Sequence, residues 1–152
     1  QQQAKIYIGI GESVTTFEQS AISYHQANQI LRVLPQIEHL GPVGYYPHCG
    51  SWALLCSLST QKELVSSFIN SYLRQINQLR DAEEMKKTLE TYLKHNGNLK
   101  QTAKALFIHQ NTLKYRLEKI EDLTGFNLAD SELRLNLSLA LRLEKLFAAT
   151  AS

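Results

Sequence analysis

The feature that most constrains the fold is a pair of short helical patterns in residues 98–120, joined by a turn too short to form an element of its own. Apolar residues recur in steps of three and four on both sides of the turn, as on one face of a helix. Two helices that cross at a steep angle need a small side chain where they touch, and Ala103 supplies it. We therefore predict a helix-turn-helix. Its inner positions are Leu99, Ala103, Leu106, Ile108, Leu113, Leu117 and Ile120.

The opposite face of the second predicted helix carries side chains suited to a DNA duplex. The amides of Gln110 and Asn111 can form paired hydrogen bonds to adenine, and Lys114 can reach the acceptors of guanine. A short helix with these groups fits the major groove. At the start of the first helix, Lys100 and Thr102 lie beside free backbone N–H groups, which favour a phosphate. Double-stranded DNA is therefore the predicted partner.

The charge distribution supports this partner and leaves one alternative open. Residues 94–119 carry six Lys and Arg residues against one acid, a local charge of +5, whereas the whole chain has +2. Residues 120–132 carry four acids and no base. Such a basic segment is typical of a polyanion-binding surface, but it is equally compatible with a solvated helix face. The alternative function is an all-α protein-interaction module that binds an acidic partner and no DNA.

The first third of the chain predicts a small α/β segment. Residues 5–10 are rich in β-branched and aromatic residues, which favours a strand, and residues 42–46 favour a second one. Between them, Thr16 and Gln19 form a capping box that begins a helix. Glycines and prolines crowd residues 41–50, which we interpret as a boundary between two units. The expected inner face of the helix is Tyr24, Ala27, Leu31 and Leu34.

The patterns after residue 50 are helical. Residues 130–147 alternate between leucine and mostly polar residues, as a strand would, but leucine favours a helix, and we predict a final helix there. The helix that begins near residue 60 has its apolar positions at Val65, Ile69, Tyr72, Ile76 and Leu79. The residues expected to cap the helices of this half are Thr60, Glu63, Asp81, Glu84, Asn98 and Gln101.

Composition and spacing exclude several classes of protein and of site. No apolar run reaches the roughly 18 residues of a membrane span, and no basic-then-apolar export signal is present. Cys49 and Cys56 are too few for a disulfide framework, fit a reducing cytosol, and with His48 match no zinc pattern. We see no catalytic constellation, so we predict neither an enzyme nor a cofactor. Because the chain begins at Gln1 without a Met, we expect a piece of a longer protein.

Residues 85–143 contain motifs that resemble the C-terminal domain of the PucR/CdaR family of bacterial transcriptional regulators. The most specific is residues 106–117, Leu-Phe-Ile-His-Gln-Asn-Thr-Leu-Lys-Tyr-Arg-Leu. The flanking pieces Tyr92-Leu-Lys-His-Asn-Gly-Asn-Leu and Ile120-Glu-Asp-Leu-Thr-Gly keep the family's order and spacing. The region also resembles the helix-turn-helix of Fis-type DNA-bending proteins. The implied fold is mainly α, a helical bundle that contains a Fis-like helix-turn-helix and follows a small α/β fragment.

A shorter resemblance covers residues 6–34, through Ile8-Gly-Ile-Gly and Ser23-Tyr-His-Gln-Ala. These pieces resemble the end of the degenerate GGDEF-like domain that precedes the helix-turn-helix in this family. The resemblance implies the C-terminal part of such a domain in residues 1–48 and an all-α helix-turn-helix DNA-binding domain in residues 49–152. It further implies a cytoplasmic regulator whose small-molecule effector binds an upstream region. No Gly-Gly-Asp-Glu-Phe sequence is present, so cyclase activity is not implied.

The resemblance also assigns roles to individual side chains. The recognition helix would span about residues 109–123. His109, Gln110 and Lys114 would face bases, whereas Lys100 and three residues of the recognition helix, Thr112, Tyr115 and Arg116, would mainly hold phosphates. The candidate DNA-binding residues are therefore Lys100, Thr102, His109, Gln110, Asn111, Thr112, Lys114, Tyr115 and Arg116.

One position departs from the general helix-turn-helix pattern. The turn residue that is usually glycine is Phe107 in this chain. A bulky residue in a left-handed conformation costs on the order of 1 kcal/mol or more. We therefore expect either a turn that avoids this conformation or enough burial of the Phe107 ring to offset the cost.

A single helix-turn-helix contacts only a few base pairs. Each contact discriminates by roughly 1–3 kcal/mol, which is too little to select one site in a genome. We therefore expect a homodimer or higher homo-oligomer that binds half-sites about 34 Å apart. The apolar stripe in residues 65–79 and the final helix are candidates for its interface, and the intrachain core is the alternative for both.

Overall fold

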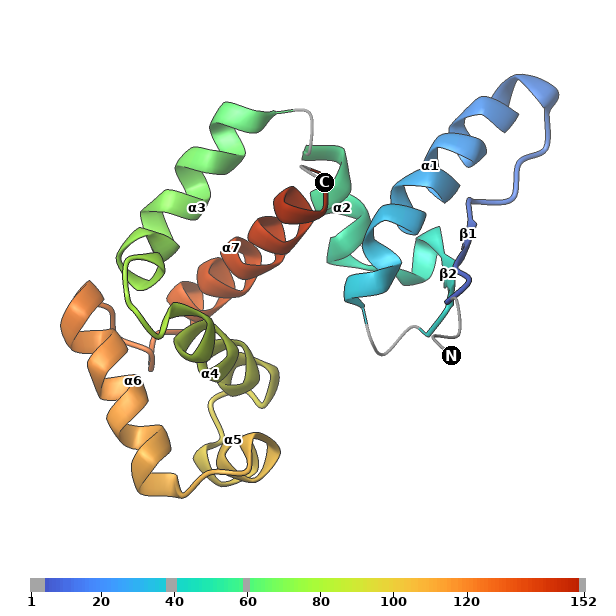
Figure 1. Ribbon diagram of the computed structural model, residues 1–152. Coiled ribbons are helices and arrows are strands. Elements are labelled where there is room, and N and C mark those ends of the chain that lie inside the picture. Colours follow the sequence, from blue (N-terminus) through green and yellow to red (C-terminus); the bar gives the residue numbers. More distant parts are fainter. Residues whose placement is uncertain (1–4, 38–40, 59–60, 151–152) are drawn as a thin grey trace. The chain divides into compact units, whose positions relative to one another are not determined.

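The computed structural model describes residues 5–37, 41–58 and 61–150, which form two compact units. One unit comprises residues 1–65 and 142–152, and the other comprises residues 66–141 (Figure 1). The helices α3 (Lys62–Asn77) and α7 (Ser131–Thr150) contribute to both units. These two units are defined by how compactly their residues pack together and not by a boundary between domains. The domain boundary predicted after residue 48 therefore remains a prediction.

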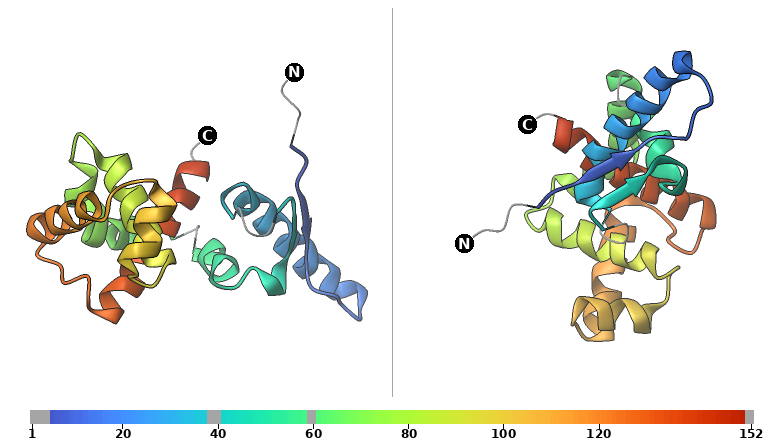
Figure 2. Two further views of the ribbon diagram at one scale, coloured as in Figure 1. Left: turned by 90° about the horizontal axis from the view of Figure 1, so that it is seen from below. Right: turned by 90° about the vertical axis from the view of Figure 1, so that its right-hand side faces the viewer.

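The first unit contains two short parallel strands. In register, β1 (Ile8–Ile10) pairs Ile8 with Val43 of β2 (Val43–Tyr45). Figure 2 shows the two strands side by side along α1 (Ser20–Val33). The helix approaches so closely that a Cβ at Gly9 would lie 2.2 Å from the carbonyl oxygen of Ala27. Both strands fall where the sequence predicts them. The other elements among the described residues of this unit include the 3₁₀ turns η1 (Phe17–Gln19), η2 (Leu34–Gln36) and η4 (Tyr46–His48) and the helix α2 (Ser51–Ser57).

The inner face of α1 differs in part from the expected one. Two members of the predicted apolar stripe, Ala27 and Leu31, lie against Gly9 of β1. Tyr24, however, is 73% exposed, so its place on the inner face was wrong. The chain after β1 packs closely against Ser23 instead. A Cβ at Gly11 would lie only 2.0 Å from the Ser23 carbonyl oxygen. The predicted capping box also fails, since the Thr16 side chain makes no capping hydrogen bond and η1 precedes the helix.

The two cysteines are buried structural thiols. Cys49 Sγ donates to the Tyr45 carbonyl oxygen at 3.3 Å, and Cys56 Sγ donates to the Gln29 carbonyl oxygen at 3.6 Å. Within the described ranges, no three His, Cys, Asp or Glu side chains gather as metal ligands would. In those same ranges, every helix is too short or too polar to cross a bilayer.

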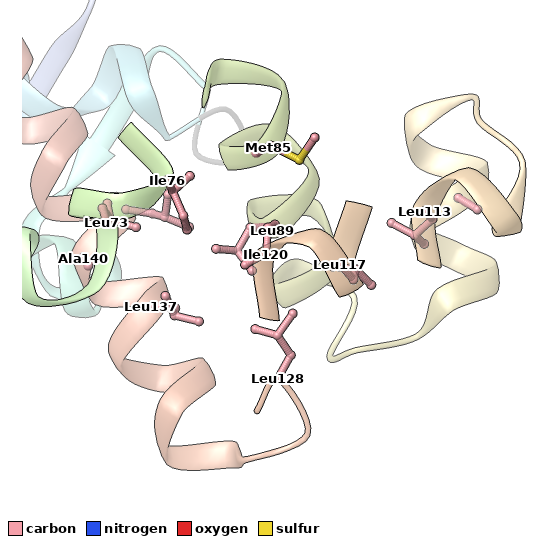
Figure 3. Packing of buried hydrophobic residues seen from close by; sticks show 12 residues of the cluster. Leu73, Ile76, Met85, Leu89, Leu113, Leu117, Ile120, Leu128, Leu137 and Ala140 are labelled. Atoms are coloured by element: carbon pink, nitrogen blue, oxygen red, sulfur yellow. The ribbon is translucent and has the colours of Figure 1, made fainter. Parts of the chain in front are cut away.

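The second unit is built around one hydrophobic core, which Figure 3 shows from close by. Leu73 and Ile76 of α3 meet Leu137 of α7, and all three are fully buried. Four of the five positions predicted for α3 lie in or against this core, namely Ile69, Tyr72, Ile76 and Leu79. Val65 is buried in the first unit instead, and the sequence interpretation missed Leu73. Thr60, the expected cap of α3, lies outside the described residues. The other helices of this unit are α4 (Ala82–Lys94), α5 (Leu99–Leu106) and α6 (Gln110–Thr124).

The final leucine-rich segment is a helix, which confirms the prediction over the strand alternative. Asp130 precedes α7 and accepts hydrogen bonds from the backbone N–H groups of Glu132 at 2.8 Å and Leu133 at 3.4 Å. Its buried residues Leu137, Ala140 and Leu141 line the core of the second unit. Beyond that point, Arg142 lies in the first unit, where its guanidinium stacks 5.5 Å from the ring centroid of Trp52.

Candidate nucleic-acid interface

The first helix of the predicted helix-turn-helix begins at a side-chain cap. Asn98 has an extended backbone, and its Oδ1 accepts a hydrogen bond from the Gln101 backbone N–H at 2.9 Å. Such a cap satisfies one of the donors that a helix leaves unpaired at its start. The predicted cap is confirmed. Lys100 is exposed in the first turn of this helix.

The turn between α5 and α6 has the hydrogen bonds of a Schellman motif. The Ile108 backbone N–H donates to the Ala103 carbonyl oxygen at 3.1 Å. This bond requires a left-handed residue between them, and Phe107 has φ 55° and ψ 40°. Ala103 is buried at the crossing, and Ile108 packs against the core of the unit.

Both expectations for Phe107 are therefore wrong. The residue adopts the left-handed conformation, and its side chain is 95% exposed, so burial does not offset the conformational cost. That cost is about 1–2 kcal/mol for a residue with a Cβ. The chain tolerates it because the flanking residues that close the turn are themselves held by the core.

The second helix begins directly after this turn. His109 is extended at φ −72° and ψ 148°, and α6 runs from residue 110 to 124, within one residue of the predicted span. Gly125 ends it with φ 71°. The inward positions Leu113, Leu117 and Ile120 are 0%, 6% and 0% exposed, which confirms the predicted inner face.

The exposed polar side chains of α6 that are candidates for DNA contacts lie in and directly before the N-terminal half of the helix. The structure leaves six consecutive or nearly consecutive side chains exposed there, and the short turn joins this end of α6 to the end of α5 (Figure 1). Amide, imidazole, hydroxyl and ammonium groups are all present, so the surface can both donate and accept hydrogen bonds. These exposed residues are His109, Gln110, Asn111, Thr112, Lys114 and Tyr115.

The helix pair has close counterparts among known proteins. Residues 85–143 match the family described as the PucR C-terminal helix-turn-helix domain. This region is a PucR-type helix-turn-helix. The match includes α4, both helices that form the crossing, and α7 as far as residue 143.

Curated relatives extend the similarity beyond this PucR-type region. The chain is 34% identical over 144 residues to the proline-responsive transcriptional activator PutR of Bacillus subtilis, covering 92% of this chain and 34% of PutR. It is 39% identical over 85 residues to the purine catabolism regulatory protein of the same organism, covering 55% of this chain and 16% of that protein. It is 46% identical over 61 residues to the carbohydrate diacid regulator of Escherichia coli, covering 40% of this chain and 16% of that protein.

The chain thus spans about a third or less of the length of these three relatives. The first is named as a transcriptional activator, and the other two are named as a regulatory protein and a regulator. Residues 85–143 are accordingly a DNA-binding regulatory module. No solved structure matches the chain.

Within the PucR-type domain, Thr102 does not lie on the surface where we expected it. Its side chain is fully buried, and its hydroxyl donates to the Asn98 carbonyl oxygen at 2.7 Å. Its backbone N–H donates to the same carbonyl at 3.0 Å, so neither group is available to a phosphate. The assignment of Thr102 as a DNA contact was wrong, because the residue lies on the inner face of α5.

Arg116 is likewise turned inward. Its Nη2 donates to Glu84 Oε1 at 2.5 Å, and its Nη1 donates to Thr88 Oγ1 at 3.2 Å. The Arg116 side chain is only 15% exposed. Its assignment as a phosphate contact was therefore wrong in this structure. The sequence pattern assigned Glu84 of α4 to helix capping, whereas its carboxylate pairs with Arg116.

Lys119 repeats this arrangement one turn further along α6. Its Nζ lies 2.8 Å from Asp81 Oδ2. The hydrogen bond from Lys119 lowers the pKa of the Asp81 carboxyl from its ordinary value, against a smaller opposing effect of burial. Asp81 makes no capping hydrogen bond through its side chain, so the capping role predicted for it was wrong. Instead Asp81 and Glu84 tie the start of α4 to α6.

These two ion pairs reduce the basic footprint that the sequence predicts. Arg116 is paired with Glu84 of α4, and Lys119 is paired with Asp81, the residue directly before α4. Within the described residues, the other four lysines of the segment are exposed and make no ion pair. Sequence counting missed this because the acids lie 32 and 38 positions away from their partners. The four lysines are Lys94, Lys100, Lys104 and Lys114.

Proposed function

We propose that this chain contains the sequence-specific DNA-binding part of an effector-responsive bacterial transcriptional regulator, with α6 in the major groove. The observation that carries the proposal is the exposed polar surface at the start of α6, whose side chains make no hydrogen bond or ion pair within the described residues, together with the four exposed lysines named above. A major groove about 12 Å wide admits one α-helix, whose first turns reach the base edges. The exposed surface occupies those first turns.

Four side chains are proposed to read bases. Gln110 offers an amide that can pair with adenine N6 and N7, and Lys114 offers an ammonium for guanine O6 and N7. His109 precedes the helix and is exposed, so its ring can reach the next base edge. Asn111 is the second amide of the same turn. All four side chains are exposed.

Three further side chains are proposed to hold the phosphate backbone. Lys100 stands at the start of α5, where the helix dipole also favours an anion. Thr112 and Tyr115 offer hydroxyl donors on the exposed side of α6. Such contacts fix the register of a protein on the duplex without selecting a sequence.

The regulator is proposed to act as a homodimer or higher homo-oligomer in the cytoplasm. One helix pair provides few base contacts, and two half-sites one helical turn apart multiply the discrimination. The small-molecule effector is proposed to bind outside these 152 residues. This is supported by the relative PutR, which is named as proline-responsive and of which the chain covers only 34%. Residues 1–48 are proposed to be the end of a GGDEF-like domain.

The proposal is tested by selecting DNA sites from a random pool with the 152-residue chain, followed by titration at several salt concentrations. With three or four lysines near phosphates, log Kd should change with log salt by a slope of about 3 to 4 per bound chain. Lys114→Gln should relax the selected sequence, whereas Lys100→Gln should weaken all sequences alike. Lys62→Gln, an exposed lysine of α3, is the matched control and should change neither property.

Two results would overturn the proposal. One is a salt-independent interaction with no selected sequence. The other is retention of an acidic protein by the α6 surface without competition from duplex DNA, which would support the protein-interaction alternative instead.

A further inference from the structure

The feature without a role so far is the side chain of Phe107. It is 95% exposed, and its backbone is in the left-handed region that glycine adopts without strain. The turn itself requires the left-handed backbone and the hydrogen bond from Ile108 to Ala103, both of which glycine would provide. Neither the turn nor the core therefore accounts for a phenyl ring at this position.

The surroundings of Phe107 in the chain are polar or cationic rather than apolar. Lys104, His109 and Gln110 are exposed, whereas the neighbouring apolar side chains of Leu106 and Ile108 pack against the core. The centre of a protein–protein interface usually needs a contiguous apolar patch. An exposed phenyl ring among polar and cationic side chains is instead complementary to a polyanion that also presents isolated apolar groups.

Phe107 lies two residues before His109, the first of the proposed base contacts. Consecutive Cα atoms are 3.8 Å apart, so its Cα lies within about 8 Å of the Cα of His109. That distance corresponds to about two base-pair steps along a duplex. The apolar group that the major groove presents is the C5-methyl of thymine, and phenylalanine is among the side chains that contact it.

We propose that Phe107 recognises the methyl group of a thymine at the edge of the DNA half-site. This inference rests on the proposed DNA-binding function and adds a specificity-determining residue to it. The ring makes an apolar contact that excludes water from the methyl group, while His109 and Gln110 address the neighbouring base edges. The selected site should therefore contain a thymine whose methyl group matters.

The test replaces each thymine of the selected site, one at a time, by deoxyuridine, which lacks only the methyl group. For the unmodified chain, one such replacement should raise Kd about fourfold, the value expected for one buried methyl group. For Phe107→Gly, the same replacement should leave Kd unchanged, because the partner of the methyl group is already absent. Affinity of this variant for the thymine-containing site should fall at least fourfold.

Folding is controlled independently. Phe107→Gly should raise the melting temperature, because glycine removes the left-handed strain, so loss of binding with a higher melting temperature cannot reflect unfolding. Phe107→Asn, which also tolerates this conformation, provides a second variant with the same expected loss. Asn96→Gly is the matched control, since Asn96 has φ 52° outside the helix-turn-helix turn, and it should leave DNA binding unchanged.

The inference is overturned if no deoxyuridine replacement distinguishes the unmodified chain from Phe107→Gly. That result leaves the proposed function intact as long as Lys114→Gln still relaxes the selected sequence. If no site is selected at all, the proposed function fails, and the role given to Phe107 fails with it.

Discussion

Removing the guanidinium of Arg116 should destabilise the fold without altering DNA contacts. In Arg116→Met, the apolar stem is retained and the hydrogen bonds to Glu84 and Thr88 are lost. A hydrogen bond to a charged group contributes about 1.5–3 kcal/mol when shielded. Because the Glu84 side chain is 54% exposed, we place this bond nearer 1 kcal/mol.

The second bond adds less. Thr88 is fully buried, but its hydroxyl also donates to the Glu84 carbonyl oxygen at 2.8 Å and therefore keeps a partner in the variant. A neutral acceptor of this kind contributes about 0.5 kcal/mol. The expected loss in unfolding free energy is therefore about 1–2 kcal/mol, and each kcal/mol lowers Tm by about 4–8 °C for a domain of this size. Urea and thermal denaturation measure it.

The salt dependence of DNA binding provides the discriminating assay. With Arg116 tied to α4, the slope of log Kd against log salt should be the same for Arg116→Met and the unmodified chain, measured well below both melting temperatures. Lys114→Gln is the opposite control, because it should reduce the slope by about 0.9 and leave Tm unchanged. A slope reduced by about 0.9 in Arg116→Met with no change in Tm would refute the reasoning and restore a phosphate contact.

Three further outcomes follow from local contacts. Asn98→Ala removes the cap of α5 and should lower the unfolding free energy by about 1 kcal/mol; an unchanged urea midpoint would contradict this. The Lys119 ammonium lowers the pKa of the Asp81 carboxyl, so this pair stabilises the fold fully above the ordinary value of 3.8 and its contribution disappears as the pH falls through the lowered pKa. Asp81→Asn should therefore make acid unfolding less steep, and coincident acid-unfolding curves for variant and unmodified chain would argue against the pair. Burial, assisted by the nearby Cys49, raises the pKa of the Cys56 thiol to about 11 from 9.0. Alkylation of Cys56 in the folded chain at pH 8 should be about 100-fold slower than in a free peptide and accelerate up to pH 11, and equal rates would exclude this explanation.

The parts of the fold that could be predicted are those decided within one or two turns of chain. The cap at Asn98 depends on a residue three positions away, and the inner face of α6 depends on spacings of three and four. Gly125 ends α6 because a left-handed residue is required there and glycine adopts it freely. Local rules of this kind need no knowledge of the partner elements.

The parts that could not be predicted depend on contacts distant in sequence. Arg116 and Lys119 were counted as free cations because nothing within one helical turn reveals their acids on α4. Tyr24 was placed inward because it has helical spacing with Ala27 and Leu31. The inner face of α1 is decided by its close packing against the strands, which the spacing does not reveal. Phe107 was misjudged since strain was weighed against burial alone, whereas the structure shows strain together with exposure.

The ion pairs of Arg116 with Glu84 and of Lys119 with Asp81 also make the charge uneven along α6. Positive charge survives around its first turns, while the carboxylates of Asp81 and Glu84 cancel the cations of its later turns. Electrostatic attraction acts before two molecules touch and favours some approach directions over others. If α6 reads DNA as proposed, an incoming duplex is attracted more strongly to the first turns of this helix than to its later turns.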